Sequence, residues 1–338
     1  MGLDYIYVNE GNNTAALIEA FQKAKDTDHA VVVHINTLKG KGYAPAEQHK
    51  EQWHYNAPFD LKTGMPLYPA DGEDYSSVTR DYLLKKMKED PTVVAITSGT
   101  PTVMGFTEDK RKEAGRQFVD VGIAEETAVA LASGIAANGG KPVYGVYSSF
   151  IQRTFDQISQ DLCIDKNPAT IVIFAGSVYG MNDVTHLGLQ DMPMLGNIPN
   201  LVYLAPTTKE EYLAMLDWSV EQTEYPVAIK LPGGAMISDG KEVKKDFRRL
   251  DQYEVTRKGS KVAVIGLGTF YGLAGQAADL IGEKTGTVPT VINPYYITGL
   301  DEELLKELKK DHDSRGHAGR WNPQWWIWRE DRTFLWRQ

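Results

Sequence analysis

The sequence has one cysteine, no long apolar run and no excess of positive charge. Cys163 is the single cysteine among 338 residues, so no disulfide can form within the chain and an oxidising compartment is not indicated. No apolar stretch approaches the roughly 18 residues needed to span a bilayer. The first residues, MGLDYIYVNEGNN, have neither the basic start nor the apolar core of a signal peptide. These absences favour a cytoplasmic protein with no membrane partner.

The charge balance also excludes a class of partner. The formal net charge is -9 and the isoelectric point is about 5.4, which argues against a surface for nucleic acid. The hydrophobic content of 42% is sufficient for a sizeable core, and the length predicts two domains or one large layered domain.

Alternating helical and apolar segments predict an α/β protein. TAALIEAFQKAK (14–25) has helical periodicity, VVVHINT (31–37) is typical of a buried strand, and LKGKGYAPAE (38–47) predicts a loop. These three elements form half of a βαβ unit without its first strand. A polar, proline-containing stretch at 60–74 then predicts a linker.

The rest of the chain has the pattern of a parallel sheet covered by helices on both faces. SSVTRDYLLKKMKED (76–90) predicts an amphipathic helix that opens with a serine cap. We expect strands at TVVAITS, KPVYGVY, ATIVIFAG and LVYLAP, and a further strand, helix and strand at KVAVIGLGTF, GLAGQAADLIG and TVPTVIN.

Two short segments carry the chemistry. GIAEETAVA contains Glu125, an acid that can lie beside a buried heterocycle, and YSSFIQRTFDQ contains Phe150, an aromatic ring that can stack on it. Taken alone, Glu125 and Glu126 would only open a helix at the positive end of its dipole, and Phe150 would be a core residue. The surrounding FVDVGIAE and AVALASGIA segments favour the functional interpretation.

Six motifs in a fixed order carry a resemblance to a known family. They are VVVHINTLKGKGYAPAE, WHYNAPFD, FVDVGIAEETAVALASGIA, KPVYGVYSSFIQRTFDQ, VTHLG and VAVIGLGTF. From about residue 30 to residue 313 the series resembles the 1-deoxy-D-xylulose-5-phosphate synthase family of the transketolase superfamily. The resemblance implies a thiamine-diphosphate-binding α/β fold with a parallel sheet covered on both faces, plus a partial transketolase C-terminal α/β domain. It also implies thiamine diphosphate and Mg²⁺ as cofactors.

The resemblance assigns roles to individual residues. It implies that Glu125 hydrogen-bonds the aminopyrimidine ring and favours its imino tautomer, and that Phe150 stacks on the same ring. Further expected residues are the proton-transfer histidines His54 and His186, the cofactor-binding residues Tyr147 and Lys39, and the substrate contacts Arg153, Tyr147 and Lys230. His34 is instead expected to be a hydrogen-bonded structural residue.

Two departures concern the acceptor substrate. Ala175 and Gly233 stand where the family has arginines that grip the phosphate of glyceraldehyde 3-phosphate, and Lys230 lies near the second position. A lysine does not reproduce the bidentate phosphate contacts of arginine. The implied reaction, decarboxylation of pyruvate and acyl transfer to glyceraldehyde 3-phosphate, therefore stays open beside transketolase-type ketol transfer or a different acceptor.

The resemblance also predicts the domain boundaries. Residues 1–59 are expected to be the end of a diphosphate-binding domain, 60–74 a linker, 75–240 the pyrimidine-binding domain, 241–313 a partial C-terminal domain and 314–338 a tail. In the family a GDG-containing N-terminal segment holds Mg²⁺ and the diphosphate, so we expect no metal ligand here. We expect the chain to be N-terminally truncated and inactive alone, with a homodimer or a separate diphosphate-binding chain completing the enzyme. A non-catalytic fragment is the remaining alternative.

The tail has an unusual composition. Its last eighteen residues hold five of the seven tryptophans, namely Trp321, Trp325, Trp326, Trp328 and Trp336, without helical or strand periodicity. Because tryptophan has one codon, a reading frame displaced by one base converts each of them to glycine. The displaced frame can encode the strand, acid and Gly-Gly turn that follow in the family. We therefore expect residues 314–338 to be out of frame.

Overall fold

The computed structural model describes residues 2–68, 72–176, 184–234 and 236–318. The chain forms two compact units, Met1–Asp71 and Gly72–Gln338, and each is described by itself. In the described part of the chain, no helix has both the length and the apolar character needed to cross a membrane.

The first unit is a small βαβ unit. It contains β1 (Asp4–Val8), α1 (Thr14–Lys25) and β2 (Val31–Ile35), followed by the short helix α2 (Ala44–Gln48). The two strands pair in parallel, so the expectation that the βαβ unit lacks its beginning is wrong. The prediction of a loop through 38–47 is also wrong in part, because a proline near the start of α2 is compatible with a helical first turn.

The second unit is built on a parallel six-stranded sheet in the order β4-β3-β5-β6-β8-β7. Its strands are β3 (Val93–Thr97), β4 (Phe118–Asp120), β5 (Lys141–Tyr147), β6 (Thr170–Phe174), β7 (Val202–Leu204) and β8 (Val227–Lys230). The fold class expected from the sequence is confirmed.

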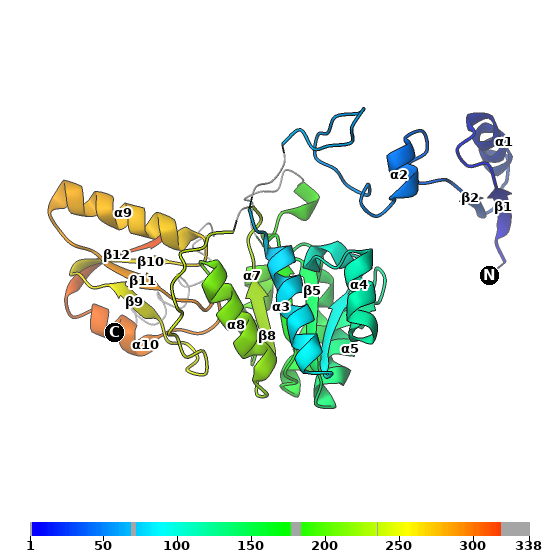
Figure 1. The fold of residues 1–338 in the computed structure, drawn as a ribbon. Coiled ribbons are helices and arrows are strands. Elements are labelled where there is room, and N and C mark those ends of the chain that lie inside the picture. The colour runs from blue at the N-terminus through cyan, green and yellow to red at the C-terminus, as the bar shows by residue number, and fades with distance from the viewer. Residues whose placement is uncertain (1, 69–71, 177–183, 235, 319–338) are drawn as a thin grey trace. The chain divides into compact units, whose positions relative to one another are not determined.

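Helices cover both faces of this sheet (Figure 1). The helical segments are α3 (Tyr75–Glu89), η1 (Pro101–Met104), α4 (Glu108–Ala114), η2 (Gly115–Gln117), α5 (Glu125–Ala137), η3 (Ile151–Thr154), α6 (Phe155–Gln157), η4 (Ile158–Ile164), η5 (Val184–His186), α7 (Asp191–Leu195) and α8 (Lys209–Glu221).

Alternation along each strand divides the core into two clusters. In β6, Val172 packs with α3 and α8 on one face, while Ile171 and Ile173 pack with α5 and η4 on the other. Because both faces are covered, the strand TIVIF is buried along its whole length. Cys163 lies in the second cluster as a buried thiol, as expected, and burial raises its pKa to about 12.

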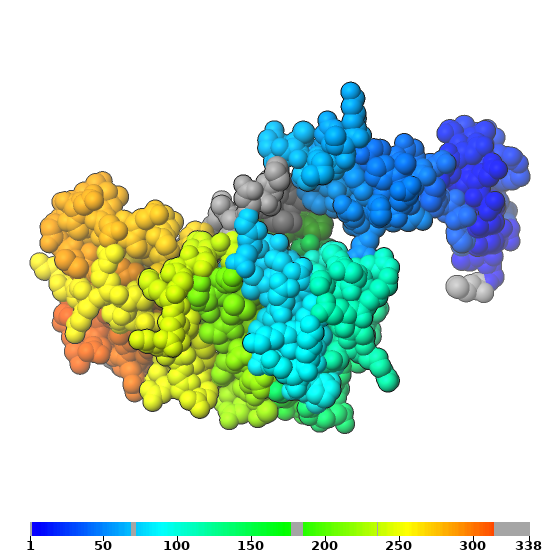
Figure 2. Space-filling model, in the orientation of Figure 1, coloured from blue at the N-terminus to red at the C-terminus, as the bar shows by residue number. Residues whose placement is uncertain are grey.

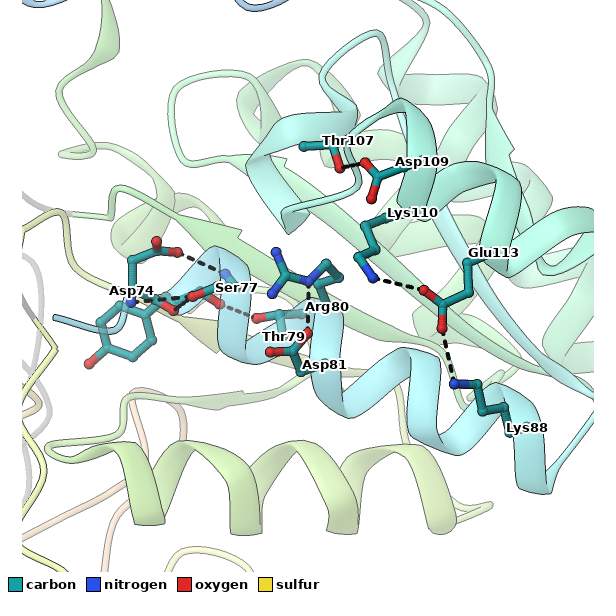
Figure 3. A network of polar contacts seen from close by, with 11 residues as sticks. Asp74, Ser77, Thr79, Arg80, Asp81, Lys88, Thr107, Asp109, Lys110 and Glu113 are labelled. Carbon is teal, nitrogen blue, oxygen red and sulfur yellow. Dashed lines mark hydrogen bonds and ion pairs between the residues drawn. The ribbon is translucent and has the colours of Figure 1, made fainter. Parts of the chain in front are cut away.

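Polar contacts fix α3 against its neighbours. Its N-cap is Asp74, whose side chain accepts a 2.8 Å bond from the Ser77 backbone in a capping box, so the predicted serine cap is wrong. Near the C-terminal end of α3, Glu113 of α4 forms ion pairs with both Lys88 and Lys110, as Figure 3 shows. Figure 2 shows the surface of α3, in cyan, beside that of α8. Lys86 of α3 bonds Glu221 of α8 there, at 2.9 Å.

The C-terminal part is a smaller mixed sheet in the order β12-β10-β11-β9, with β9 antiparallel. Its elements are β9 (Glu254–Arg257), β10 (Lys261–Gly266), α9 (Phe270–Thr285), β11 (Thr290–Asn293), α10 (Glu302–Leu308) and β12 (His312–Ala318).

Strand β12 includes the first residues of the predicted tail. It pairs with β10 as far as residue 318, so the first five residues of the predicted tail belong to a strand of the C-terminal sheet. The five tail tryptophans lie outside the described residues. The out-of-frame origin of the tail stays a prediction.

Candidate active site

The predicted site residues of the second unit lie at the carboxyl ends of the strands of the six-stranded sheet. Tyr147 ends β5 and Lys230 ends β8, while Glu125 begins the helix that follows β4. Phe150 and His186 lie in the connections after β5 and β6. In open parallel sheets, ligands bind at the carboxyl ends of the strands, where such connections converge.

Glu125 is a buried acid at the start of α5. Only 2% of its side chain is exposed, whereas its neighbour Glu126 is exposed. The N-cap residue, Ala124, supplies no side-chain bond to the first backbone N–H groups, so an acid is favoured there by the helix dipole. The helix-opening interpretation therefore accounts for Glu126, but it does not account for the burial of Glu125.

Arg153 is the ionic partner of Glu125. Its Nη1 donates a 2.7 Å hydrogen bond to Oε1 of the carboxylate, and its guanidinium carbon lies 5.7 Å from the centre of the Phe150 ring. A buried carboxylate needs such a partner, because burying an isolated charge is strongly unfavourable. The Arg153 side chain is 52% exposed, so solvent can reach the arginine side of the pair.

Three rings form a wall beside this ion pair. Phe150 lies 5.3 Å from His186 and 5.5 Å from Tyr147, centre to centre, and both contacts are edge-on. Tyr147 and His186 are 6.1 Å apart, also edge-on. Burial raises the pKa of the Tyr147 hydroxyl, so it stays protonated at neutral pH. The edge-on geometry keeps the three rings in mutual contact.

Lys230, predicted as a substrate contact, has a buried partner in the structure. Its Nζ donates a 2.5 Å bond to Oδ2 of Asp191, and the Tyr203 hydroxyl donates a 2.6 Å bond to the same oxygen. The Asp191 side chain is fully buried and that of Lys230 is 10% exposed. Burial lowers the pKa of Lys230 against the opposing effect of Asp191. Sequence reasoning missed Asp191 and Tyr203, which are 39 and 27 residues from Lys230 along the chain.

The two positions that lack the family arginines are also described. Ala175 is buried, with a positive φ of 52°, and Gly233 is half-buried. Near Ala175, the Ser148 hydroxyl is buried without a hydrogen-bond partner among the described residues.

The remaining predicted residues belong to the first unit. Lys39 Nζ and His54 Nδ1 contact each other closely, and His54 is exposed. His34 Nδ1 contacts the Tyr5 hydroxyl, in agreement with its expected hydrogen-bonded role, although the histidine is exposed. The structure thus brings Lys39 and His54 together in one unit. In the second unit it brings together Glu125, Arg153, Phe150, Tyr147 and His186, whereas Lys230 pairs with Asp191.

These residues fit one end of thiamine diphosphate. A buried carboxylate beside an aromatic ring supplies a hydrogen-bonding partner and a stacking surface for an aminopyrimidine. At the other end of the cofactor, the described residues contain no group of three or more His, Cys, Asp or Glu side chains arranged to hold a metal ion.

Comparison with known proteins defines the class. The family described as "Transketolase, pyrimidine binding domain" matches residues 72–236, and that described as "Transketolase, C-terminal domain" matches residues 251–315. The six-stranded parallel sheet lies within the first range, and the smaller mixed sheet lies within the second except for the end of β12, which extends to residue 318. The chain belongs to the transketolase family.

Curated relatives identify the branch of this family that the chain resembles. It is 37% identical over 316 residues to a 1-deoxy-D-xylulose-5-phosphate synthase of Natranaerobius thermophilus, covering 93% of this chain and 49% of the relative. It is 38% identical over 311 residues to a synthase of the same name from Clostridium beijerinckii, covering 92% and 50%. The resemblance predicted from the six motifs is confirmed. The chain spans about half the length of the curated relatives it matches.

Solved structures support the fold. The chain is similar to a split gene transketolase, described as an inactive β4 tetramer, with a TM-score of 0.65 and 21% identity, covering 79% of this chain and 86% of that one. It is also similar to a Pichia stipitis transketolase in complex with sedoheptulose 7-phosphate, with a TM-score of 0.59 and 16% identity, covering 94% and 63%. At these identities the likeness concerns the fold alone.

Proposed function

We propose that this chain supplies the pyrimidine-binding and C-terminal domains of a thiamine-diphosphate-dependent transferase of the transketolase class. The reaction proposed is that named for its relatives, 1-deoxy-D-xylulose-5-phosphate synthesis, in which pyruvate loses carbon dioxide and its acyl unit joins glyceraldehyde 3-phosphate. The supporting observation is the buried Glu125 carboxylate, which forms an ion pair with Arg153. The same arginine lies over the Phe150 ring.

Each residue of the site has a distinct task in this proposal. When bound, thiamine diphosphate supplies the carbanion chemistry that decarboxylation requires. Glu125 binds and orients the aminopyrimidine by a hydrogen bond to a ring nitrogen, and Phe150 stacks on the ring. His186 transfers protons near the reacting carbon, where an imidazole is effective at neutral pH. Arg153 balances the charge of the Glu125 carboxylate.

The test is reconstitution with a diphosphate-binding domain. The full chain is mixed with that domain from a synthase relative, and product formation from pyruvate and D-glyceraldehyde 3-phosphate is followed with thiamine diphosphate and Mg²⁺. We expect turnover with the wild-type chain and none with Glu125→Ala. Turnover that survives the Glu125→Ala substitution would contradict the assigned role.

The chain by itself is expected to bind thiamine diphosphate poorly. In the family the Mg²⁺ and diphosphate contacts come from an N-terminal domain, and these contacts supply charge-assisted bonds that the pyrimidine end lacks. Calorimetric titration of the isolated chain should therefore show no saturable binding in the micromolar range. Saturation at about 1 μM, equivalent to roughly -8 kcal/mol, would refute this expectation.

A second candidate concerns the acceptor. The Lys230 ammonium is engaged by Asp191 at 2.5 Å, and Ala175 and Gly233 carry no charge. These features favour an acceptor that is not gripped by its phosphate, as in a synthase-like enzyme with a different aldehyde. In the reconstituted enzyme, glyceraldehyde and its 3-phosphate should then be used with similar kcat/KM. A strict dependence on the phosphate would rule this candidate out.

A third candidate is a subunit of a split enzyme. The chain covers 86% of the split gene transketolase chain but only 49% of the Natranaerobius thermophilus synthase. In this candidate the chain associates with a separate diphosphate-binding chain. Sedimentation velocity of the chain with and without that domain distinguishes a heteromeric complex from a homodimer of this chain alone.

A further inference from the structure

A buried ion pair lies at the base of the connection that carries His186. The connection starts after β6, which ends at Phe174, and it returns to the core at Asp191, the first residue of α7. Asp191 is fully buried, and its Oδ2 accepts bonds from both Lys230 and Tyr203. Its Oδ1 has no hydrogen-bond partner among the described residues. Lys230 is therefore the one positive charge bonded to this carboxylate in the described part of the chain.

Lys230 also contacts the beginning of the same connection. A side chain at Gly176 would place its Cβ 2.7 Å from both Cγ and Nζ of Lys230, so the lysine stem occupies the space beside this glycine. The Gly176 backbone N–H donates a 2.6 Å bond to the carbonyl oxygen of Leu231, the residue after Lys230. The end of β8 thus contacts the connection at two places. Leu231 accepts a backbone hydrogen bond from Gly176, and Lys230 donates to Asp191.

Near Asp191 the connection passes close to the strand ends. At Gly188, a Cβ would lie 2.6 Å from the Ala175 carbonyl oxygen and 2.6 Å from Oγ of Ser148, so only glycine fits. His186, two residues earlier, packs edge-on against Phe150 and Tyr147. A small displacement of this connection would therefore move the His186 ring relative to the aromatic wall.

We propose that Lys230 is a positioning residue that sets the place of His186, and that it is not a substrate ligand. It acts by joining the two ends of the connection, Gly176 and Asp191, through its stem and its ammonium group. The consequence for catalysis rests on the proposed function of His186, whereas the geometric claim does not. This distinction allows the two to be tested separately.

The test observes the His186 ring directly. The full chain is labelled at the histidine ring nitrogens, and the seven histidines are recorded by two-dimensional NMR as a function of pH. The His186 signal is assigned from its loss in His186→Asn. In Lys230→Met, which keeps the length of the stem and removes the charge, we expect the ring signals of His186 to shift relative to those of the wild type.

A matched control separates positioning from general stability. Lys86→Met removes another lysine that is largely buried, with a side chain 20% exposed, from contacts with Asp217 and Glu221. These contacts join α3 to the last turn of α8, away from the connection that carries His186. We expect Lys86→Met to leave the His186 signal unchanged.

A double variant separates the loss of positioning from the loss of stability that an unpaired buried charge would cause. Lys230→Met combined with Asp191→Asn removes both buried charges and keeps an acceptor for the Tyr203 hydroxyl, and the loss of both members of a buried ion pair is commonly tolerated. The proposal predicts that this variant recovers the melting temperature while the His186 signal stays displaced, because the link between the two ends is lost. The proposal is overturned if the His186 signal of the double variant, or of a folded Lys230→Met, coincides with that of the wild type. Failure of the reconstituted enzyme to turn over would instead bear on the proposed function alone.

Discussion

The two ends of the six-stranded sheet carry charge in different ways. At the amino end, Lys141 of β5 bonds Glu221 at 2.6 Å and Asp90 at 3.0 Å, and these side chains are between 25% and 45% exposed. At the carboxyl end, the acids Glu125 and Asp191 are 2% and 0% exposed, and among the described residues each has one basic partner. The amino end resembles an ordinary surface network, which contributes little free energy. Buried acids carry a larger desolvation cost, so we expect Glu125 and Asp191 to serve a task other than stability.

The largest effect is expected at Glu125. Glu125→Gln keeps the shape of the side chain but removes the acid, so turnover of the reconstituted enzyme should fall by about 10²–10⁴-fold, the usual contribution of a positioned acid or base. Glu126→Gln is the control, because this neighbouring acid is exposed. Initial rates of carbon dioxide release measure both. Equal rates in the two variants would remove the distinction between the adjacent acids.

The second effect compares stability at the two ends. Lys230→Met leaves a buried carboxylate unpaired and should lower the free energy of unfolding by about 3–5 kcal/mol. Lys141→Met at the amino end should lower it by about 1 kcal/mol or less, because its partners remain partly hydrated. Urea denaturation of the full chain measures both changes. A larger loss for Lys141→Met would reverse the comparison.

A smaller effect is expected from the aromatic wall. Phe150→Ala removes the ring that we expect to stack on the aminopyrimidine, a contact of about 0.5–1.5 kcal/mol, or up to roughly tenfold in affinity. Phe155→Ala is the control, since this ring is 42% exposed and lies in α6, shortly after Phe150 in the sequence. Cofactor affinity of the reconstituted enzyme should separate the two variants. Similar losses would point to a general effect of this segment.

The smallest effect is a pH dependence at the amino end. Hydrogen bonds from Thr92, together with Lys141, lower the pKa of Asp90 to about 2. Because the folded pKa lies below the unfolded value of about 3.9, this stabilisation is present above pH 4 and is lost as the pH falls toward 2. Asp90→Asn should therefore flatten the acid limb of a stability profile recorded by thermal melting. An unchanged limb would show that Asp90 does not contribute.

Much of the fold follows from local sequence pattern. The uninterrupted apolar runs of β5 and β6 and the period of α1 and α9 predict these elements, because covered parallel strands and amphipathic helices leave strong patterns. Strand β1 was not predicted, because DYIYV begins with an acid and is largely exposed. The cap of α3 was misassigned because Asp74 and Ser76 are both good caps, and the geometry of the first turn decides between them.

The site was predictable only where a motif carries it. Glu125 and Phe150 stand in motifs, and the structure places both near Arg153. The pairing of Lys230 with Asp191 depends on where β8 ends and α7 begins, and no local pattern encodes that contact. The roles assigned to Glu125 and Phe150 stay predictions, as do those of His54 and Lys39, which lie in the other unit.

The central claim is that the carboxyl end of the sheet recognises an aminopyrimidine. The most direct measurement titrates the free pyrimidine fragment of thiamine into the labelled full chain and follows the His186 ring signal. We predict a saturable shift with a Kd on the order of 1 mM, equivalent to about -4 kcal/mol, that disappears in Glu125→Ala and persists in Glu126→Ala. No shift in the wild-type chain, or the same shift in Glu125→Ala, would contradict the account.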